Sequence, residues 1–269
     1  MITGHTRIYG IVADPIHHVK TPEEMNALFS AIGHDGVLVP FHVRMPDLAA
    51  FMDALRGMQN FAGLIATVPH KTTMLAICDE VLGDAARIGA VNAVRRDPDG
   101  RLIGAMLDGR GFVAGLQAEG VDPTGMDACL LGAGGAGAAI AFALAEAGVA
   151  RLTIVNRTID KARDLARRVA DTYPATRVDA GLPETPQRDL IVNATSLGLR
   201  AGDALPLDDH SFRGGQIVAE AIMEPELTPL LALARDRGAR IHFGRPMLRH
   251  QIRLMARHLG APFPSDASA

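Results

Sequence analysis

One stretch restricts the fold of this chain more than any other: "ACLLGAGGAGAAIAFALAEAG", residues 128–148. An apolar run of strand length leads into a loop with four glycines, and an alanine-rich run long enough for a helix follows. A strand joined to a helix by a glycine loop is typical of doubly wound α/β domains. Strand-like and helix-like runs alternate along most of the chain, which predicts an α/β fold with parallel sheets.

Gly132, Gly134 and Gly137 have the G-x-G-x-x-G spacing within that loop. Between a strand and a helix, this spacing predicts a dinucleotide site. The glycines permit a tight turn and let backbone N–H groups approach a pyrophosphate at the positive end of the helix. We expect Gly135 and Ala136 to line the same site. The alternative is a glycine-rich turn that serves packing alone.

The next predicted strand, "RLTIV", ends in Asn156-Arg157-Thr158, and Asn156 lies 19 residues after Gly137. An NAD-binding domain usually has Asp or Glu at about this interval, where it binds the ribose 2′-hydroxyl. Here Arg157 offers a guanidinium group to a 2′-phosphate, Thr158 a hydroxyl, and Lys161 further positive charge. These residues predict NADP rather than NAD. The alternative for Arg157 is an ordinary surface arginine.

Composition restricts the partners. The 269 residues favour two domains. Twenty-seven Lys and Arg against 30 Asp and Glu leave a net charge of −3 without a long basic run, which predicts no nucleic-acid or membrane partner. The chain has two cysteines, far apart in sequence, and no secretory signal is apparent. It also has no run of about 18 apolar residues that could span a membrane. These observations predict a cytoplasmic protein with reduced thiols. Both a monomer and a homodimer fit the sequence.

Local signals predict the remaining elements. Thr21 followed by Pro22 predicts a helix start with Thr21 as N-cap, and "PHKTTMLAICDEV" a single helix after Pro69. Two apolar runs around Asp-Pro-Asp-Gly predict a hairpin. We expect residues 1–107 to form one domain and residues 108–244 a second, with residues 245–269 packing back on the first.

Nine segments together resemble the shikimate dehydrogenase family: "DPIHHVKTPEEMN", "TVPHK", "GAVNAV", "LDGRGF", "GAGGAG", "NRT", "NATSLGL", "EPELTPLL" and "GRPMLRHQ" follow the family's order. The resemblance implies an N-terminal α/β substrate domain, a C-terminal Rossmann-type NADP domain and an active-site cleft between them. It also implies reversible hydride transfer between NADP and a secondary hydroxyl of a small-molecule substrate.

The same resemblance assigns catalysis to Lys71 and Asp108. Oxidation of an alcohol by hydride transfer requires the hydroxyl proton to leave, and a lysine beside a carboxylate can accept and relay it. The alternative is a structural ion pair. By resemblance, substrate hydroxyls would bind Thr67, Asn92 and Gln251, each of which could instead be a capping or core polar group. Further residues are expected beside the cofactor: Thr195, Ser196, Met223 and Gly244.

The sequence departs from the family pattern in the substrate pocket. Two serines of the family correspond to Val19 and Thr21, an asparagine to Ile65, and the tyrosine and aspartate of one element to Met223 and Glu220. Each lost partner of a buried polar group costs on the order of 1–3 kcal/mol. We therefore expect a pocket with a less polar face, still formed in part by Val19, Thr21, Ile65 and Met223.

His17, His18 and Lys20 lie beside Val19, where a cation could meet a carboxylate. They lack the further ligands that a metal site requires, and we expect no metal ion here. Three hypotheses follow. The chain oxidises a shikimate-like or less polar substrate; it is an authentic shikimate or quinate dehydrogenase, which would place it in aromatic amino acid biosynthesis; or it is a non-catalytic NADP-binding sensor.

Overall fold

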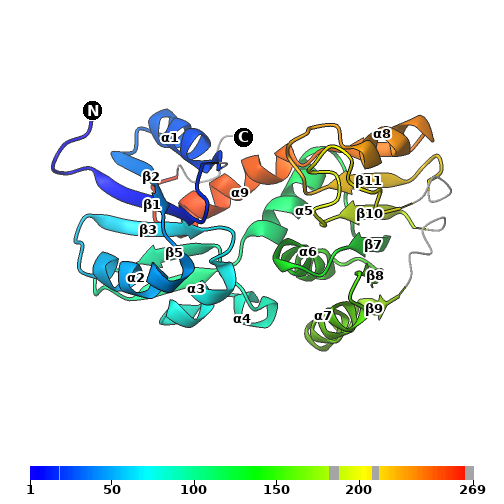
Figure 1. The fold of residues 1–269 in the computed structure, drawn as a ribbon, viewed down its shortest axis with the longest axis horizontal. Helices are drawn as coiled ribbons and strands as arrows, with labels where there is room; N and C mark the ends of the chain where they lie inside the picture. Colours follow the sequence, from blue (N-terminus) through cyan, green and yellow to red (C-terminus); the bar gives the residue numbers. More distant parts are fainter. Residues whose placement is uncertain (18, 182–187, 208–211, 264–269) are drawn as a thin grey trace. The chain divides into compact units, whose positions relative to one another are not determined.

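The computed structural model describes residues 1–17, 19–181, 188–207 and 212–263. The chain divides into two compact units (Figure 1). Unit 1 comprises Met1–Leu107 and Ile252–Ala269, and unit 2 comprises Asp108–Gln251. The last helix, α9 (Arg245–His258), contributes its residues up to Gln251 to unit 2 and the rest to unit 1.

Unit 1 contains a six-stranded sheet in the order β2-β1-β3-β5-β6-β4. Strand β5 runs antiparallel to β3 and β6, whereas the other neighbours are parallel. Its elements before α9 are β1 (Arg7–Ala13), α1 (Thr21–Ala31), β2 (Gly36–His42), η1 (Met45–Asp47), α2 (Leu48–Arg56), β3 (Phe61–Ala66), α3 (Lys71–Ile77), β4 (Glu80–Val81), α4 (Ala85–Ile88), β5 (Ala93–Arg96) and β6 (Leu102–Ala105).

The predicted hairpin is confirmed as β5 and β6, with Gly100 at a φ of +89° in its turn. The single helix predicted after Pro69 was wrong at its end. Helix α3 stops at Ile77, and the next residues form β4, which pairs with β6. The N–H and carboxylate of Asp79 both bond the backbone of Leu102, so pairing with a strand edge outweighs local helix propensity.

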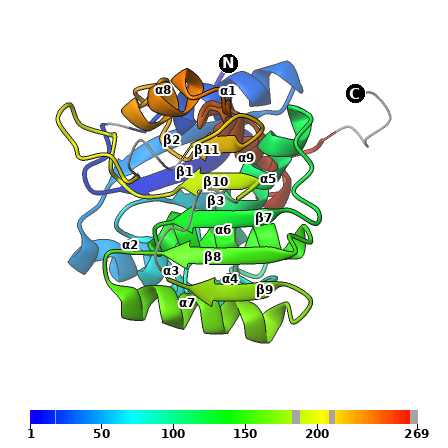
Figure 2. The same ribbon diagram turned by 90° about the vertical axis from the view of Figure 1, so that its right-hand side faces the viewer.

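Unit 2 contains a six-stranded parallel sheet in the order β12-β11-β10-β7-β8-β9 (Figure 2). The strand order reverses between β7 and β10, and ligands of doubly wound sheets bind at this point, outside the carboxyl ends of the strands. Its elements are α5 (Asp108–Ala118), β7 (Asp127–Leu131), α6 (Gly135–Glu146), β8 (Arg151–Val155), α7 (Ile159–Thr172), β9 (Arg177–Ala180), β10 (Leu190–Asn193), β11 (Ile217–Glu220), α8 (Pro229–Asp236), β12 (Arg240–His242) and the start of α9.

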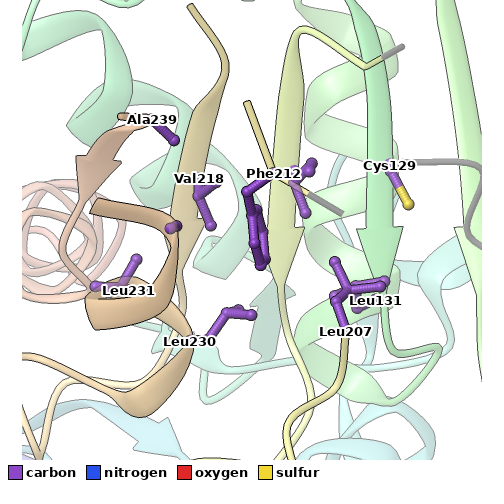
Figure 3. Packing of buried hydrophobic residues seen from close by; sticks show 10 residues of the cluster. Cys129, Leu131, Leu207, Phe212, Val218, Leu230, Leu231 and Ala239 are labelled. Carbon is purple, nitrogen blue, oxygen red and sulfur yellow. The ribbon is translucent and has the colours of Figure 1, made fainter. Parts of the chain in front are cut away.

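An apolar core holds β7, β10, β11 and α8 in place. In Figure 3 the ring of Phe212 lies beside Val218 of β11, and Leu230 and Leu231 of α8 belong to the same cluster as Leu131 of β7. Burial of such side chains contributes about 1.5–3 kcal/mol each. The core therefore fixes the strand ends from which the loops of the candidate site emerge.

No helix in the described part of the chain has the length and apolar character that crossing a bilayer requires.

Candidate active site

The glycine loop of unit 2 joins β7 to α6 at the carboxyl edge of the sheet. Gly132 has a φ of +106°, and a Cβ there would lie 2.8 Å from the carbonyl oxygen of Ala194. A Cβ on Gly137 would lie 2.2 Å from the carbonyl oxygen of Gly132. Both positions require glycine, because the loop closes tightly against itself and against the chain after β10.

Gly134 and Gly135 serve a different purpose, since a Cβ at either position would meet nothing within 4 Å. Gly134 is the N-cap of the 12-residue helix α6 and, as a glycine, has no side chain with which to cap it. Ala136 and Gly137 complete its first turn. Open space in front of uncapped N–H groups, at the positive end of a helix, fits the pyrophosphate of a dinucleotide.

Asn156 connects the glycine loop to the turn after β8. Its side chain accepts a hydrogen bond from the Ala133 N–H (3.1 Å) and donates one to the Thr158 carbonyl (3.0 Å). Sequence reasoning predicted a cofactor contact at Asn156 and did not foresee this bridging role. Arg157, Thr158 and Lys161 are exposed, so their side chains are accessible to a 2′-phosphate.

Two further loops border the same edge of the sheet. Thr195 is half-buried against the glycine loop, and Ser196 is exposed. A Cβ on Gly244 would lie 2.2 Å from the carbonyl oxygen of Ile222, so the chain after β12 packs directly on the loop after β11. That loop contains the half-buried Met223. Unit 2 thus brings the predicted cofactor residues together at one sheet edge.

Glu220, the last residue of β11, was not among the predicted site residues. It is fully buried, and its carboxylate accepts hydrogen bonds from the side chains of Asn193 (3.1 Å) and Thr228 (3.0 Å) and from the Ile222 N–H (3.2 Å). Burial raises the pKa of Glu220 to about 7, although these donors favour the ionised form. The sequence signal for this residue was an acidic side chain at the end of the otherwise uncharged strand "QIVAE".

Lys71 is the first residue of α3 in unit 1 and is half-buried. Its carbonyl accepts the Val91 N–H (2.9 Å). The preceding residue, His70, is fully buried, and its Nε2 lies 2.8 Å from the Val43 carbonyl oxygen. The carbonyl of Thr67, itself half-buried, accepts the His70 N–H (2.8 Å). These bonds hold the start of α3, and with it Lys71, at the carboxyl end of β3.

Ile65 lies on β3 of unit 1, and Asn92 directly precedes the neighbouring strand β5. Asn92 is fully buried, and its Oδ1 accepts a hydrogen bond from the Leu107 N–H (2.9 Å). Ile65 is 2% exposed and pairs with Ala93 of β5. The amide oxygen of Asn92 therefore supports the chain after β6. A contact of either residue with substrate remains a prediction.

Helix α1 begins one residue earlier than predicted. Lys20 occupies the N-cap position and Thr21 is the first helical residue, because Lys20 already has near-helical angles (φ −102°, ψ −8°). No side chain caps α1, so the Thr21 hydroxyl is not used in capping. Val19 and Thr21 are half-buried, His17 and Lys20 are exposed, and His18 lies outside the described residues.

Asp108 opens α5 in unit 2, is 2% exposed and accepts a hydrogen bond from the side-chain amide of Gln251 on α9. The two helices approach closely: a Cβ on Gly111 would lie 2.7 Å from the Cβ of Gln251, and one on Gly115 3.1 Å from the Met247 nitrogen. The glycines of α5 thus bring two predicted site residues into contact.

Across the described residues, no group of three or more His, Cys, Asp or Glu side chains is placed to hold a metal ion.

Comparison with known families identifies the two halves of the chain. Residues 11–94 match the shikimate dehydrogenase substrate binding domain, and residues 117–198 match shikimate / quinate 5-dehydrogenase. The chain is 40% identical over 255 residues to the shikimate dehydrogenase (NADP(+)) of Rubrobacter xylanophilus, which covers 93% of this chain and 89% of that protein.

Solved structures resemble the chain over nearly its whole length. The ligand-free 5-ketofructose reductase of Gluconobacter sp. strain CHM43 is 31% identical with a TM-score of 0.88, covering 98% of this chain and 96% of that one. The shikimate 5-dehydrogenase of Thermus thermophilus, in complex with NADP(H) and shikimate, is 32% identical with a TM-score of 0.87, covering 97% and 95%.

The doubly wound sheet, its glycine loop and these relatives define an NADP-dependent dehydrogenase that acts on a CH–OH donor. The chain belongs to the shikimate dehydrogenase family. The predicted family, α/β fold class and NADP cofactor are confirmed.

Proposed function

We propose that the enzyme interconverts a secondary alcohol and a ketone on a polyhydroxylated substrate that carries no carboxylate. The observation that carries this proposal is the apolar character of Val19, Ile65 and Met223, at positions where the family usually has serine, asparagine and tyrosine. Val19 and Met223 are half-buried and Ile65 is buried. Valine and isoleucine side chains have no hydrogen-bonding group, and methionine has only a weakly accepting sulfur.

The energetic consequence is larger for an acid than for a neutral molecule, because a hydrogen bond to a charged group contributes about 1.5–3 kcal/mol and one between neutral groups about 0.5–1.5 kcal/mol. Each lost partner costs on the order of 1–3 kcal/mol, and two such losses reduce affinity by roughly a hundredfold. A substrate without a carboxylate needs no replacement for the serine hydroxyl. The similarity to a 5-ketofructose reductase supports this choice, because a keto sugar is polyhydroxylated and uncharged.

Lys71 and Asp108 are the proposed proton-handling residues. Bound NADP supplies the hydride acceptor. As the C–H bond of the alcohol breaks, the O–H proton passes to the Lys71 amine and the C=O bond forms. Asp108 serves as the carboxylate partner, oriented by its hydrogen bond from Gln251. Thr67 and Asn92 are proposed to position the remaining hydroxyls.

A comparison of kcat/KM values tests the substrate. Shikimate and quinate are assayed with NADP, and 5-ketofructose with NADPH, at saturating cofactor. We expect the neutral ketone to be turned over at least tenfold more efficiently than either acid. A shikimate kcat/KM within the ordinary enzyme range of about 10⁴–10⁸ M⁻¹s⁻¹ that exceeds the ketone value would reject the proposal.

That rejecting result would support the second candidate, an authentic shikimate dehydrogenase. The 40% identity to the Rubrobacter xylanophilus enzyme favours it, as do the hydroxyl kept at Thr21 and the retention of Asn92 and Gln251. The two candidates differ in substrate and share the proposed catalytic residues.

The Lys71→Ala substitution tests the proton acceptor. We expect kcat to fall by about 10²–10⁴-fold, the usual contribution of a general base, with NADPH affinity unchanged. Fluorescence titration of NADPH provides the affinity, and the Arg101→Ala substitution at an exposed cationic residue provides the control. Equal activity of wild type and Lys71→Ala would contradict the assignment.

We also propose that the enzyme works in a reducing compartment such as the cytoplasm. Cys78 and Cys129 are free thiols, and burial raises the pKa of each to about 12, which disfavours the reactive thiolate. Sedimentation of the purified chain distinguishes a monomer from a homodimer.

A further inference from the structure

The carboxylate of Glu220 joins three segments of unit 2 that are distant in sequence. Its Oε2 accepts hydrogen bonds from Asn193 at the end of β10 and from Thr228 at the start of α8, and its Oε1 accepts the Ile222 N–H in the loop after β11. Glu220 and Thr228 are 0% exposed, as is Asn193. A fully buried acid with three donors is a connecting group, since each donor would otherwise lie unpaired in the protein interior.

The two side chains bonded to Glu220 organise their own segments. Asn193 accepts hydrogen bonds from the N–H (3.1 Å) and hydroxyl (2.7 Å) of Thr195 and donates one to the Leu197 carbonyl (3.1 Å), so it shapes the loop after β10. Thr228 caps α8 by accepting the Leu231 N–H (3.2 Å). A shift of the Glu220 carboxylate would therefore disturb both segments.

Both loops held by Glu220 support glycines at the cofactor edge. Ala194, in the loop after β10, is the residue against which Gly132 closes, with a carbonyl oxygen 2.8 Å from the position of a Cβ. Ile222, in the loop after β11, lies in the same way against Gly244. Glu220 is thus connected to Gly244 through Ile222, and to Gly132 through Asn193 and the adjoining Ala194.

We propose that Glu220 is a positioning residue for the cofactor: it holds the loops after β10 and β11 in one arrangement, and through them the glycines on which NADP rests. This inference rests on the cofactor site proposed above. None of the three hydrogen bonds joins Glu220 to the glycine loop itself. Glu220 acts on the loops through Asn193 and Ile222.

Replacing Glu220 with glutamine, which has nearly the same shape, tests the role of the carboxylate group alone. In Glu220→Gln, one oxygen becomes an NH₂ group, which must face either the Ile222 N–H or the donors from Asn193 and Thr228. We expect the NADPH Kd to rise about tenfold, with kcat reduced and KM for the alcohol or ketone changed less than twofold. Glu220→Asp keeps an acceptor carboxylate on a shorter chain, and we expect it to recover part of the NADPH affinity.

Gln216 provides a matched control at the opposite end of β11. It is 1% exposed, donates to the Arg188 carbonyl (3.0 Å) and accepts the Arg213 N–H (2.7 Å). We expect Gln216→Met to lower the melting temperature without altering NADPH affinity, measured by fluorescence titration of each variant.

The two kinds of failure are distinguishable. If Glu220→Gln and Glu220→Asp bind NADPH as the wild type does, while melting temperatures fall as in Gln216→Met, Glu220 is only structural and the inference is wrong. Wild-type protein that does not bind NADPH would instead overturn the cofactor site itself. If Glu220→Gln does not fold, the affinity of Glu220→Asp decides: an unchanged Kd rejects the inference and a raised Kd supports it.

Discussion

Val19, two residues before the first residue of α1, has an isopropyl group at a position where the family usually has a serine hydroxyl. Thr21 retains its hydroxyl, and α1 does not use that hydroxyl as a cap. One hydrogen-bonding group is thus kept and one is absent within three residues. A net hydrogen bond to a charged group contributes about 1.5–3 kcal/mol, so a single side chain is sufficient to change substrate preference.

The Val19→Ser substitution should therefore raise kcat/KM for shikimate by about tenfold or more, mainly through KM. Val19→Ala is the control, because it removes the same bulk without supplying a hydroxyl. Steady-state kinetics on both variants provides the comparison. If alanine and serine have the same effect, steric space rather than hydrogen bonding governs this position.

Glu220 predicts a pH dependence of stability. Its folded-state pKa of about 7 lies above the ordinary value of 4.5, so between these values the folded state binds more protons than the unfolded state. The contribution of Glu220 to stability is fully present below about pH 4.5 and is lost as pH rises through about 7. At about 1.4 kcal/mol per pKa unit, the loss is on the order of 3 kcal/mol.

Wild type should lose more unfolding free energy between pH 5 and pH 8 than Glu220→Gln does, because glutamine does not titrate. Urea unfolding at both pH values measures this difference. The contributions of the other titrating groups largely cancel, because they are the same in both proteins. Parallel profiles for the two proteins would show that the pKa of Glu220 is not raised.

At the scale of elements, glycine has two opposite uses in unit 2. In α5, a Cβ on Gly109 would lie 2.0 Å from the Ala139 carbonyl oxygen, so this glycine lets α5 and α6 touch. At the start of α6, a Cβ on Gly134 would meet nothing within 4 Å. The first glycine serves packing within the protein, whereas the second leaves room for a ligand.

The Gly109→Ala and Gly134→Ala substitutions should therefore have different effects. Gly109→Ala forces the helices apart, and we expect a loss of about 1–3 kcal/mol in unfolding free energy. Gly134→Ala should keep the wild-type melting temperature and raise the NADPH Kd by about tenfold or more, because its methyl group enters the pyrophosphate space. Thermal unfolding and fluorescence titration test both. Normal NADPH binding by Gly134→Ala would place the pyrophosphate elsewhere.

At the scale of the whole molecule, each unit has its own six-stranded sheet, and the proposed cofactor residues all belong to unit 2. A ligand that binds only the folded protein stabilises it by mass action. The cofactor should therefore act as a stabiliser whose effect depends on the 2′-phosphate, since Arg157 is exposed in the turn after β8.

NADPH at a hundred times its Kd should add about 2.7 kcal/mol to the unfolding free energy of the part of the protein that binds it. NADH at the same concentration should add clearly less. Calorimetry with each cofactor measures the shift, and the Arg157→Ala variant should abolish the difference between them. Equal stabilisation by both cofactors in wild type would contradict a 2′-phosphate site at Arg157.

Signals that act within a few residues determined much of this protein from its sequence. Glycine spacing predicted the loop after β7, the Asn156-Arg157-Thr158 run predicted NADP, and strand–helix alternation predicted the parallel sheet of unit 2. These features are readable because φ preference, helix polarity and hydrophobic periodicity are local properties of the chain.

Contacts between distant residues were decided by the tertiary structure alone. Gln251 bonds Asp108 across 143 positions, and Glu220 bonds Asn193 across 27. The short strands β4 and β9 were missed because two to four residues have little preference of their own until a neighbouring strand offers its N–H and C=O groups. Burial and the choice of hydrogen-bond partner arise only when the chain has folded, and they decided which polar side chains hold the candidate site together.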